Sequence, residues 1–411
     1  MKKYFNALSI LLNNANNIFF FLKSKKKYIN KSINEISYKE IYAKQNVPKF
    51  NNSAMDGYAV ISEHTKNIDK ENEFFVLKTI PAEKKIEYKV IKKNTVSKIM
   101  TGAKIPDIFN AVVKKEDTEI LNKKKIIIKK NIKVEENIRI FGSDYKKNDI
   151  LLNKGEIIKT SHILTLSATG IKLLNILIKP KIYMICSGNE ITDKIIKKTN
   201  ENIIFNSSGP YIKNFLKNIG FEVIYLGLTK DDKKKFLEKI EPILSNEELS
   251  IIITTGAVSV GSFDFISEAL KSIKTKILFH GVKIKPGKPI LFGKYKKNKY
   301  FFCLPGNPAS SIIGTRFFIY PFLRQTIGIH QEKPIKAKLK TEYKLKIKFD
   351  SFLKAFCYCE NSVFYVKILD EQDSFKTFQF CKSNAFVLLK QKDQIKINDL
   401  IDVYFYNPLN L

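Results

Sequence analysis

Residues 249–264 read Leu-Ser-Ile-Ile-Ile-Thr-Thr-Gly-Ala-Val-Ser-Val-Gly-Ser-Phe-Asp, and this stretch decides the fold. Residues 251–253 are consecutive isoleucines, which predict a strand buried on both faces of a parallel sheet. A loop of small residues follows and ends in the carboxylate of Asp264. Loops at the carboxyl ends of such strands are where α/β sheets bind ligands. The alternative is an ordinary turn in which Asp264 caps a helix beginning at Phe265.

Strand and helix patterns alternate on both sides of this loop. We expect further strands at 181–186, 221–226 and 300–304, and helices at 209–218, 231–244, 265–273 and 308–323. Strands that alternate with helices form parallel sheets. The sequence therefore predicts a multidomain α/β protein whose central sheet is doubly wound and mostly parallel, with β-rich inserted and C-terminal domains.

The chain has 411 residues, too many for a single core, and its composition changes along its length. Short strands and turns flank the alternating region on both sides. We expect four domains: a discontinuous α/β linker domain (1–50 plus 146–177), an inserted β-rich domain (51–145), a ligand-binding α/β domain (178–326) and a C-terminal β-barrel-like domain (327–411).

The formal net charge of +32 suggests nucleic-acid binding, but the kind of basic residue argues against it. Only three of the 72 basic residues are arginine, the residue that reads guanine edges and phosphates most specifically. Lysine, asparagine and isoleucine are abundant together, as expected from an AT-biased genome. We therefore expect no specific nucleic-acid partner, although the charge will attract anionic ligands.

The five cysteines form no CxxC pair, which favours reduced thiols in a cytoplasmic protein. The apolar residues near the N-terminus are interrupted by four asparagines between positions 13 and 17. Such a segment is too short and too broken for a membrane span, and its basic residues follow the apolar run rather than precede it. We interpret it as an amphipathic helix and expect no membrane association.

Several turns carry groups suited to binding anions or a hard cation. Helix N-termini and lysines attract oxyanions, whereas carboxylates suit magnesium. Taken singly, each group has an ordinary alternative as a turn residue, a helix cap or a solvated side chain. The candidates with such groups are Asp56, Thr101, Glu190, Asp264, Lys285, Lys288 and Ser310. Their joint occurrence points to a site that brings two anions together around a metal.

With these motifs in place, the chain resembles the molybdopterin molybdenumtransferases. This family inserts molybdate into adenylylated molybdopterin with release of AMP, which forms molybdenum cofactor. The resemblance extends over nearly the whole chain and is most specific at 50–60, 99–103, 255–264, 285–289 and 304–310. It implies a homodimer whose active site lies between the central α/β domain and the inserted domain of the partner subunit. It also allows a further partner, the molybdopterin adenylyltransferase.

The resemblance implies roles for individual residues. Asp56, Thr101, Glu190, Asp264, Lys285 and Lys288 match catalytic positions, and Glu190 and Asp264 would hold Mg²⁺. Substrate-binding positions match Thr255, Gly256, Ser259, Gly261, Asn206, Pro305, Gly306, Asn307 and Ser310. Molybdate and adenylylated molybdopterin would be the substrates.

The chain departs from the family pattern at four places. Asn189, in Gly188-Asn189-Glu190, stands where the family usually has an aspartate. Asn206 stands where the family has an aspartate, which keeps the hydrogen-bonding shape but loses a negative charge. Ala257 replaces a glycine. The family's C-terminal arginine is missing, and Lys348 or Lys354 would replace it as a point charge without the bidentate fork. These departures leave an alternative function, a molybdopterin-binding or scaffold protein without turnover.

Overall fold

The computed structural model describes residues 1–16, 18, 22–66, 73–83, 86–88, 91–194, 202–258, 265–343, 349–391 and 395–408. The chain forms two compact units. The first comprises Met1–Lys25, Asn34–Ile36 and Ile176–Leu411, and the second comprises Lys26–Ile33 and Ser37–Asn175. The result is a multidomain α/β protein.

A six-stranded sheet forms the centre of the first unit. In spatial order its strands are β16 (Val223–Thr229), β13 (Lys181–Ser187), β17 (Ser250–Thr255), β21 (Lys299–Leu304), β20 (Leu291–Tyr295) and β18 (Lys276–His280). The first four are parallel, and β20 and β18 are antiparallel to their neighbours. The run at 251–253 is fully buried in β17, as its sequence predicted. The sequence pattern did not predict β18 and β20, because both strands are short and carry lysine, and β20 also contains a glycine.

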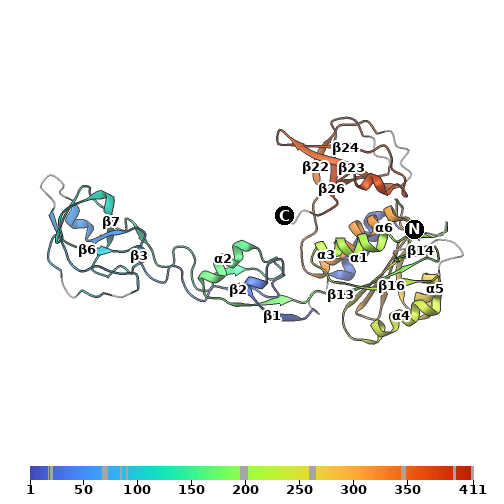
Figure 1. Cartoon of the computed structure of the whole chain (residues 1–411), viewed down its shortest axis with the longest axis horizontal. Helices are drawn as coiled ribbons and strands as arrows, with labels where there is room; N and C mark the ends of the chain where they lie inside the picture. The colour runs from blue at the N-terminus through green and yellow to red at the C-terminus, as the bar shows by residue number, and fades with distance from the viewer. Residues whose placement is uncertain are drawn as a thin grey trace. The chain divides into compact units, whose positions relative to one another are not determined.

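Helices cover both faces of this sheet. Figure 1 shows α3 (Ser208–Asn218) and α6 (Pro308–Gly314) on one side and α4 (Lys233–Ser245) and α5 (Phe265–Ser272) on the other. Buried side chains of α4 and α5, among them Phe236 and Ile266, pack with Ile252 of β17 and Phe301 of β21 in one apolar core. The sequence placed the start of α4 at Asp231. The N-cap is Asp232, whose carboxylate accepts from two backbone N–H groups of the first turn.

The apolar segment after Pro308 does not form one regular helix. A π-helical turn, η5 (Thr315–Ile319), separates α6 from α7 (Tyr320–Thr326). The N-terminal helix α1 (Tyr4–Ala15) lies against α7, and the Tyr4 hydroxyl donates to the Phe317 carbonyl at 3.5 Å. Burial of Tyr4 and Leu11 therefore groups α1 with the central sheet rather than with residues 146–177.

The C-terminal strands close into a small barrel. They are β22 (Ile335–Leu339), β23 (Asp350–Glu360), β24 (Val363–Ile368), β25 (Ala385–Leu389) and β26 (Leu400–Phe405). Pairing of β23 with both β24 and β25 completes the ring. The two-residue strand β19 (Ile284–Lys285) pairs in parallel with β23, so the barrel is joined to the segment that carries Lys285 and Lys288.

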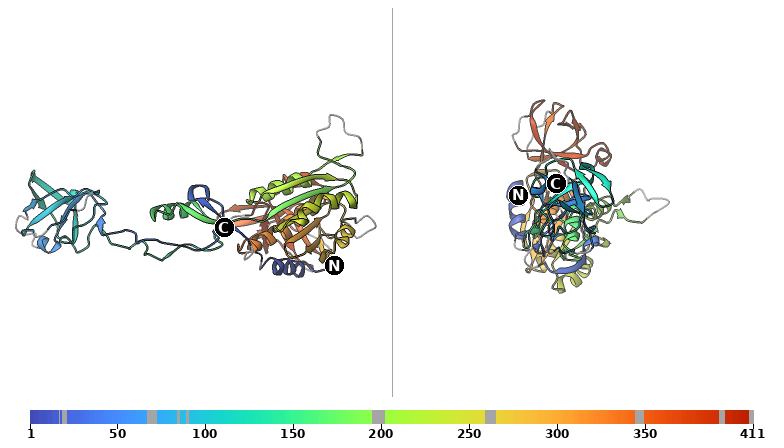
Figure 2. Two further views of the ribbon diagram at one scale, coloured as in Figure 1. Left: turned by 90° about the horizontal axis from the view of Figure 1, so that it is seen from below. Right: turned by 90° about the vertical axis from the view of Figure 1, so that its left-hand side faces the viewer.

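The second unit contains a six-stranded sheet, drawn in blue to cyan in Figure 2. Its order is β7 (Ala111–Lys114), β4 (Gly57–Val60), β6 (Thr95–Ile99), β5 (Glu73–Val76), β9 (Lys125–Ile128) and β8 (Thr118–Asn122). Shorter pairs are β3 (Asn52–Ser53) with β10 (Ile138–Arg139), β2 (Ile41–Tyr42) with β11 (Ile150–Leu152), and β1 (Ser24–Tyr28) with β12 (Leu173–Leu177), beside helix α2 (Thr160–Ala168).

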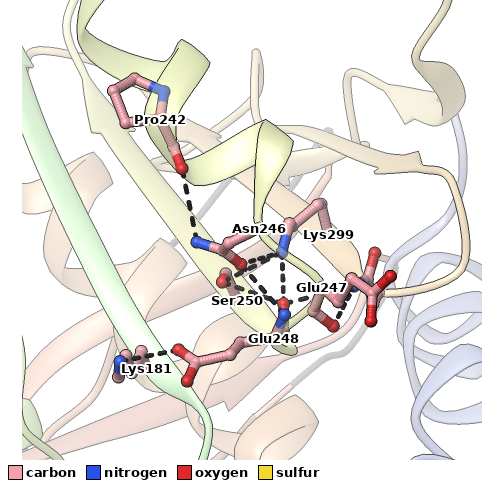
Figure 3. Close-up of polar contacts among 8 residues, drawn as sticks. Lys181, Pro242, Asn246, Glu247, Glu248, Ser250 and Lys299 are labelled. Atoms are coloured by element: carbon pink, nitrogen blue, oxygen red, sulfur yellow. Dashed lines mark hydrogen bonds and ion pairs between the residues drawn. The ribbon is translucent and has the colours of Figure 1, made fainter.

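A buried lysine fastens the amino edge of the central sheet (Figure 3). Lys299, at the start of β21, is fully buried, and its Nζ donates to Asn246 Oδ1 at 2.7 Å and to the Glu248 carbonyl. Its third partner, Ser250 Oγ at 3.4 Å, begins β17. Burial lowers the pKa of Lys299, but every ammonium hydrogen has an acceptor. The loop before β17 is thus held to the β20–β21 hairpin, at the edge opposite the loops that follow β13, β17 and β21.

Within the part of the chain that the structure describes, no helix is long and apolar enough to cross a membrane.

Candidate active site

The carboxyl ends of three neighbouring strands of the central sheet, β13, β17 and β21, are in close contact. The Gly256 nitrogen, just after β17, donates to the Leu304 carbonyl of β21 at 3.1 Å. The Ser187 hydroxyl of β13 donates to the Thr255 carbonyl at 3.2 Å. Gly256 has φ +90°, and a Cβ there would lie 2.1 Å from the Ser187 carbonyl oxygen. Only glycine fits, so the backbone itself forms the surface of this loop.

The loop after β21 continues this surface toward α6. A Cβ on Gly306 would lie 3.4 Å from Gly256 Cα, so the two glycine loops are in close contact. Asn307 is the N-cap residue of α6, and its Nδ2 donates to Ser374 Oγ of the barrel segment at 2.9 Å. Its Oδ1 is buried without a hydrogen-bond partner among the described residues. Ser310 is buried in the first turn of α6.

These contacts bring together six of the sequence-predicted substrate-binding residues. They are Thr255, Gly256, Pro305, Gly306, Asn307 and Ser310. Two glycines expose the main chain, and the N-terminus of α6 supplies unpaired N–H groups and the positive end of a helix dipole. This combination can cradle a phosphate or another oxyanion.

Lys285 and Lys288 lie on a single turn, and both are exposed. Between them, Gly287 has φ +102°, and a Cβ there would contact Ile284, Ile290 and the α6 residue Ile313 at 3.2–3.7 Å. The turn is therefore seated on α6 by its apolar side, while its two ammonium groups remain available to an anionic ligand.

Two carboxylates come shortly after the neighbouring strands β13 and β16. Glu190 follows β13 and Asp231 follows β16, and these two strands are parallel neighbours. Burial and the Glu190 charge both raise the pKa of Asp231, as expected for like charges held close together. Sequence reasoning treated Asp231 only as a helix start. The signal that could have found it is strand order, because adjacent parallel strands end at the same edge.

Asn206 is held in a polar cluster that the sequence did not predict. Its Oδ1 accepts from the Gly209 nitrogen at 2.9 Å, and its Nδ2 donates to Asp193 Oδ1 at 2.9 Å and to the Tyr225 hydroxyl at 3.2 Å. Tyr225 in turn donates to Asp193 Oδ2 at 2.5 Å. Burial and the hydrogen bond to Asp193 raise the pKa of Tyr225, which keeps its hydroxyl protonated as a donor.

Three of the predicted residues, Ser259, Gly261 and Asp264, lie outside the described residues. Among the residues that are described, no group of three or more His, Cys, Asp or Glu side chains is placed to hold a metal ion. The Glu190 and Asp231 pair nevertheless fits magnesium, which takes one or two protein carboxylates and completes its shell with water and substrate phosphates.

In the second unit, the structure brings Asp56 and Thr101 together. The Thr101 nitrogen donates to Asp56 Oδ1 at 2.6 Å, and its hydroxyl donates to the same oxygen at 2.7 Å. These two hydrogen bonds lower the pKa of Asp56. Both side chains are exposed and lie next to exposed methionines, Met55 and Met100.

The proposed replacement for the missing C-terminal arginine needs correction. Lys354 is only 3% exposed, and its Nζ donates to the Asp373 carbonyl at 3.0 Å, next to the Ser374 that holds Asn307. Burial lowers the pKa of Lys354. The ammonium group of Lys354 therefore contacts the barrel segment at Asp373 rather than an open anion site, and it stabilises that segment. Lys348 lies outside the described residues.

Comparisons with known proteins agree with this architecture. The model of the MoeA N-terminal region (domain I and II) matches residues 3–170, and that of a probable molybdopterin binding domain matches residues 183–325. A molybdopterin molybdenumtransferase of Staphylococcus epidermidis is 34% identical over 331 residues, covering 80% of this chain and 78% of that relative. A molybdopterin molybdenumtransferase of Staphylococcus aureus is 31% identical over 331 residues, which again cover 80% of this chain and 78% of the relative. The solved structure of a molybdopterin biosynthesis moeA protein from Pyrococcus horikosii has a TM-score of 0.79 at 25% identity, covering 96% of this chain and 98% of that one.

Two family models match consecutive regions of this multidomain α/β chain, which has glycine loops at the edge of its central sheet. Proteins of this class build molybdenum cofactor. This chain belongs to the molybdopterin molybdenumtransferase family, as the motifs had indicated.

Proposed function

We propose that this protein inserts molybdate into adenylylated molybdopterin, releases AMP and so forms molybdenum cofactor. The observation that carries this proposal is the close packing of the Gly256 and Gly306 loops beside the N-terminus of α6. Family membership supports it. Helices on both faces of the largely parallel sheet support a doubly wound arrangement, in which ligands bind at the carboxyl edge.

In this mechanism the cradle binds the phosphate end of the substrate. Main-chain N–H groups around Gly256 and at the start of α6 approach the phosphate oxygens because no side chain intervenes. Asn307 Oδ1, which has no hydrogen-bond partner among the described residues, accepts a hydrogen bond from the ligand. Ser310 offers a hydroxyl in the same turn. These groups act by positioning and electrostatics, without a covalent intermediate on the protein.

Lys285 and Lys288 bind the second anion, molybdate. Both ammonium groups are exposed on a turn whose underside is anchored to α6, so they offer charge from a fixed position. A rigid cluster of cations stabilises an oxyanion better than mobile surface lysines, because little reorganisation is needed. The two lysines would hold molybdate close to the sulfur atoms of the pterin.

Glu190 and Asp264, together with Asp231, would hold Mg²⁺. When bound, the ion supplies positive charge at the phosphate from which AMP departs.

We further propose a homodimer in which Asp56 and Thr101 complete the site of the partner subunit. Exposed Met55 and Met100 flank this pair, and methionine is enriched in protein interfaces. The adenylylated substrate would come from the molybdopterin adenylyltransferase. None of the five cysteines forms a disulfide, which supports a reducing compartment such as the cytoplasm.

The experiment is direct reconstitution. Purified protein, adenylylated molybdopterin, Mg²⁺ and molybdate are mixed, and AMP is quantified together with the active cofactor formed. The proposal expects both products in equal amounts. Tight binding of the pterin without AMP at saturating molybdate would instead indicate the scaffold role.

A further inference from the structure

A single carboxylate organises the polar cluster around Asn206. Asp193, just after β14 (Ile191–Thr192), accepts from Asn206 with one oxygen at 2.9 Å and from Tyr225 with the other at 2.5 Å. Asn206 follows β15 (Ile204–Phe205), and Tyr225 lies within β16. One side chain therefore ties together three separate segments at the carboxyl edge of the sheet.

The amide of Asn206 has no freedom left in this arrangement. Both hydrogens of its Nδ2 are donated, one to Asp193 and one to Tyr225. Its Oδ1 accepts from the Gly209 nitrogen in the first turn of α3. The oxygen must face the helix and the nitrogen must face the carboxylate. Asn206 thus has no donor to offer a ligand, and its role is to pass the orientation set by Asp193 to α3.

The cluster is continuous with the phosphate cradle. A Cβ on Gly209 would lie 2.6 Å from Asn206 Nδ2 and 3.1 Å from Cys186 Sγ, so helix, amide and thiol are in close contact. Cys186 is buried near the end of β13, where it is the register partner of Thr255 on β17, and burial raises the pKa of its thiol. Thr255 directly precedes the cradle glycine Gly256.

We propose that Asp193 is a positioning residue of this active site. Its carboxylate fixes Asn206 and Tyr225, holds the start of α3 against β13, and carries the negative charge on this side of the cradle. Loss of Asp193 would loosen α3 against the end of β13, where Ser187 donates to the Thr255 carbonyl beside Gly256, and the bound substrate would sample more orientations. The inference rests on the proposed function, because AMP release is its main readout.

A charge swap tests it, using the full-length protein. D193N removes the charge, and N206D places two carboxylates at hydrogen-bond distance with no donor between them. The double variant D193N/N206D restores one amide and one carboxylate with reversed direction, while Asp at 206 still accepts from the Gly209 nitrogen. We expect kcat for AMP release to fall about tenfold in each single variant and to return to within about threefold of wild type in the double variant. KM should change little.

Two controls separate positioning from folding. E238Q removes an equally exposed negative charge on α4 and should leave kcat unchanged. Titration of each protein to saturation with adenylylated pterin counts its intact sites, so a variant that is only partly folded would show fewer sites but a normal kcat per site. A double variant no better than the product of the single effects, or a D193N with unchanged kcat, would overturn the inference. If wild type released no AMP, the proposed function would fail, and affinity for the adenylylated pterin would be compared across the same proteins with the same expected pattern.

Discussion

Thr101 donates two hydrogen bonds to the same oxygen of Asp56, from its backbone nitrogen at 2.6 Å and from its hydroxyl at 2.7 Å. The two residues are 45 positions apart and come from different turns of the second unit. These two hydrogen bonds fix the orientation of the exposed carboxylate and lower its pKa, so it stays ionised. A fixed charge on an exposed rim is suited to a ligand that arrives from outside its own unit.

Replacing Thr101 should change the ionisation of Asp56. T101V removes the hydroxyl but keeps the backbone bond, so the pKa of Asp56 should rise part of the way toward its ordinary 3.8. Because the native pKa is lowered, the stabilisation is present above pH 3.8 and is lost as the pH falls through the folded-state value. Carboxyl NMR titration of aspartate-labelled protein measures this. T101S retains the hydroxyl and should titrate like wild type, and an unshifted T101V would contradict the assignment.

Gly256 should tolerate no side chain. G256A would force a Cβ to within 2.1 Å of the Ser187 carbonyl at a φ of +90°, so the loop must move. We expect a loss of about 2 kcal/mol or more in the free energy of unfolding and a severe loss of AMP release. The matched control is A257G at φ +46°, where removing a methyl relieves a strained backbone and should leave stability equal or higher by about 1 kcal/mol. Urea denaturation compares the two, and equal effects would refute the steric argument.

The two exposed lysines should set the affinity for molybdate. K285Q and K288Q each remove one cation from the anchored turn, so the molybdate concentration for half-maximal rate should rise about tenfold. K283Q changes an exposed lysine on the same segment and should leave that concentration unaltered. Rates of AMP release over a molybdate titration provide the measurement. An equal response in all three variants would mean that only overall charge matters.

A shared active site should permit complementation between defective subunits. D56N and K288Q, each purified separately, are mixed under conditions that exchange subunits. If each site takes residues from both chains, mixed dimers contain one intact site, and activity should recover to about a quarter of wild type. Mixing either variant with itself is the control. Absence of recovery despite proven subunit exchange would place the whole site within one chain.

Removing the buried ammonium of Lys299 should weaken the amino edge of the sheet. K299M keeps the side-chain volume but leaves Asn246 Oδ1 and the Glu248 carbonyl without their donor. We expect a loss of about 1–3 kcal/mol in the free energy of unfolding, with KM for the pterin unchanged because the ligand loops lie at the opposite edge. K297M, at an exposed neighbour, should be neutral. A K299M protein with raised KM would show that the two edges are coupled.

The sequence predicted what depends on local pattern. Three consecutive isoleucines identified the buried strand β17, and the glycine and proline turns located the loops after β17 and β21. Asp56 and Thr101 were selected individually, and the structure pairs them.

Contacts set by strand order could not be read from the chain. Asp193 and Tyr225 are 32 residues apart and meet only because β16 lies beside β13. The pairing of Asp231 with Glu190 has the same origin. Lys354 was misjudged for a different reason, since a lysine in a polar sequence is normally solvated, yet closure of the barrel buries this one against Asp373.

The bare backbone at Gly256 has a consequence for how this chain has changed. A ligand approaching that loop encounters main-chain atoms, whose positions do not depend on which side chains surround them. Lysine, asparagine and isoleucine can therefore be abundant over most of the chain, and residue 257 can carry a methyl group, while the main-chain surface offered to the ligand stays the same. At this position the ligand meets a surface whose shape is set by the backbone and not by the chemistry of a side chain.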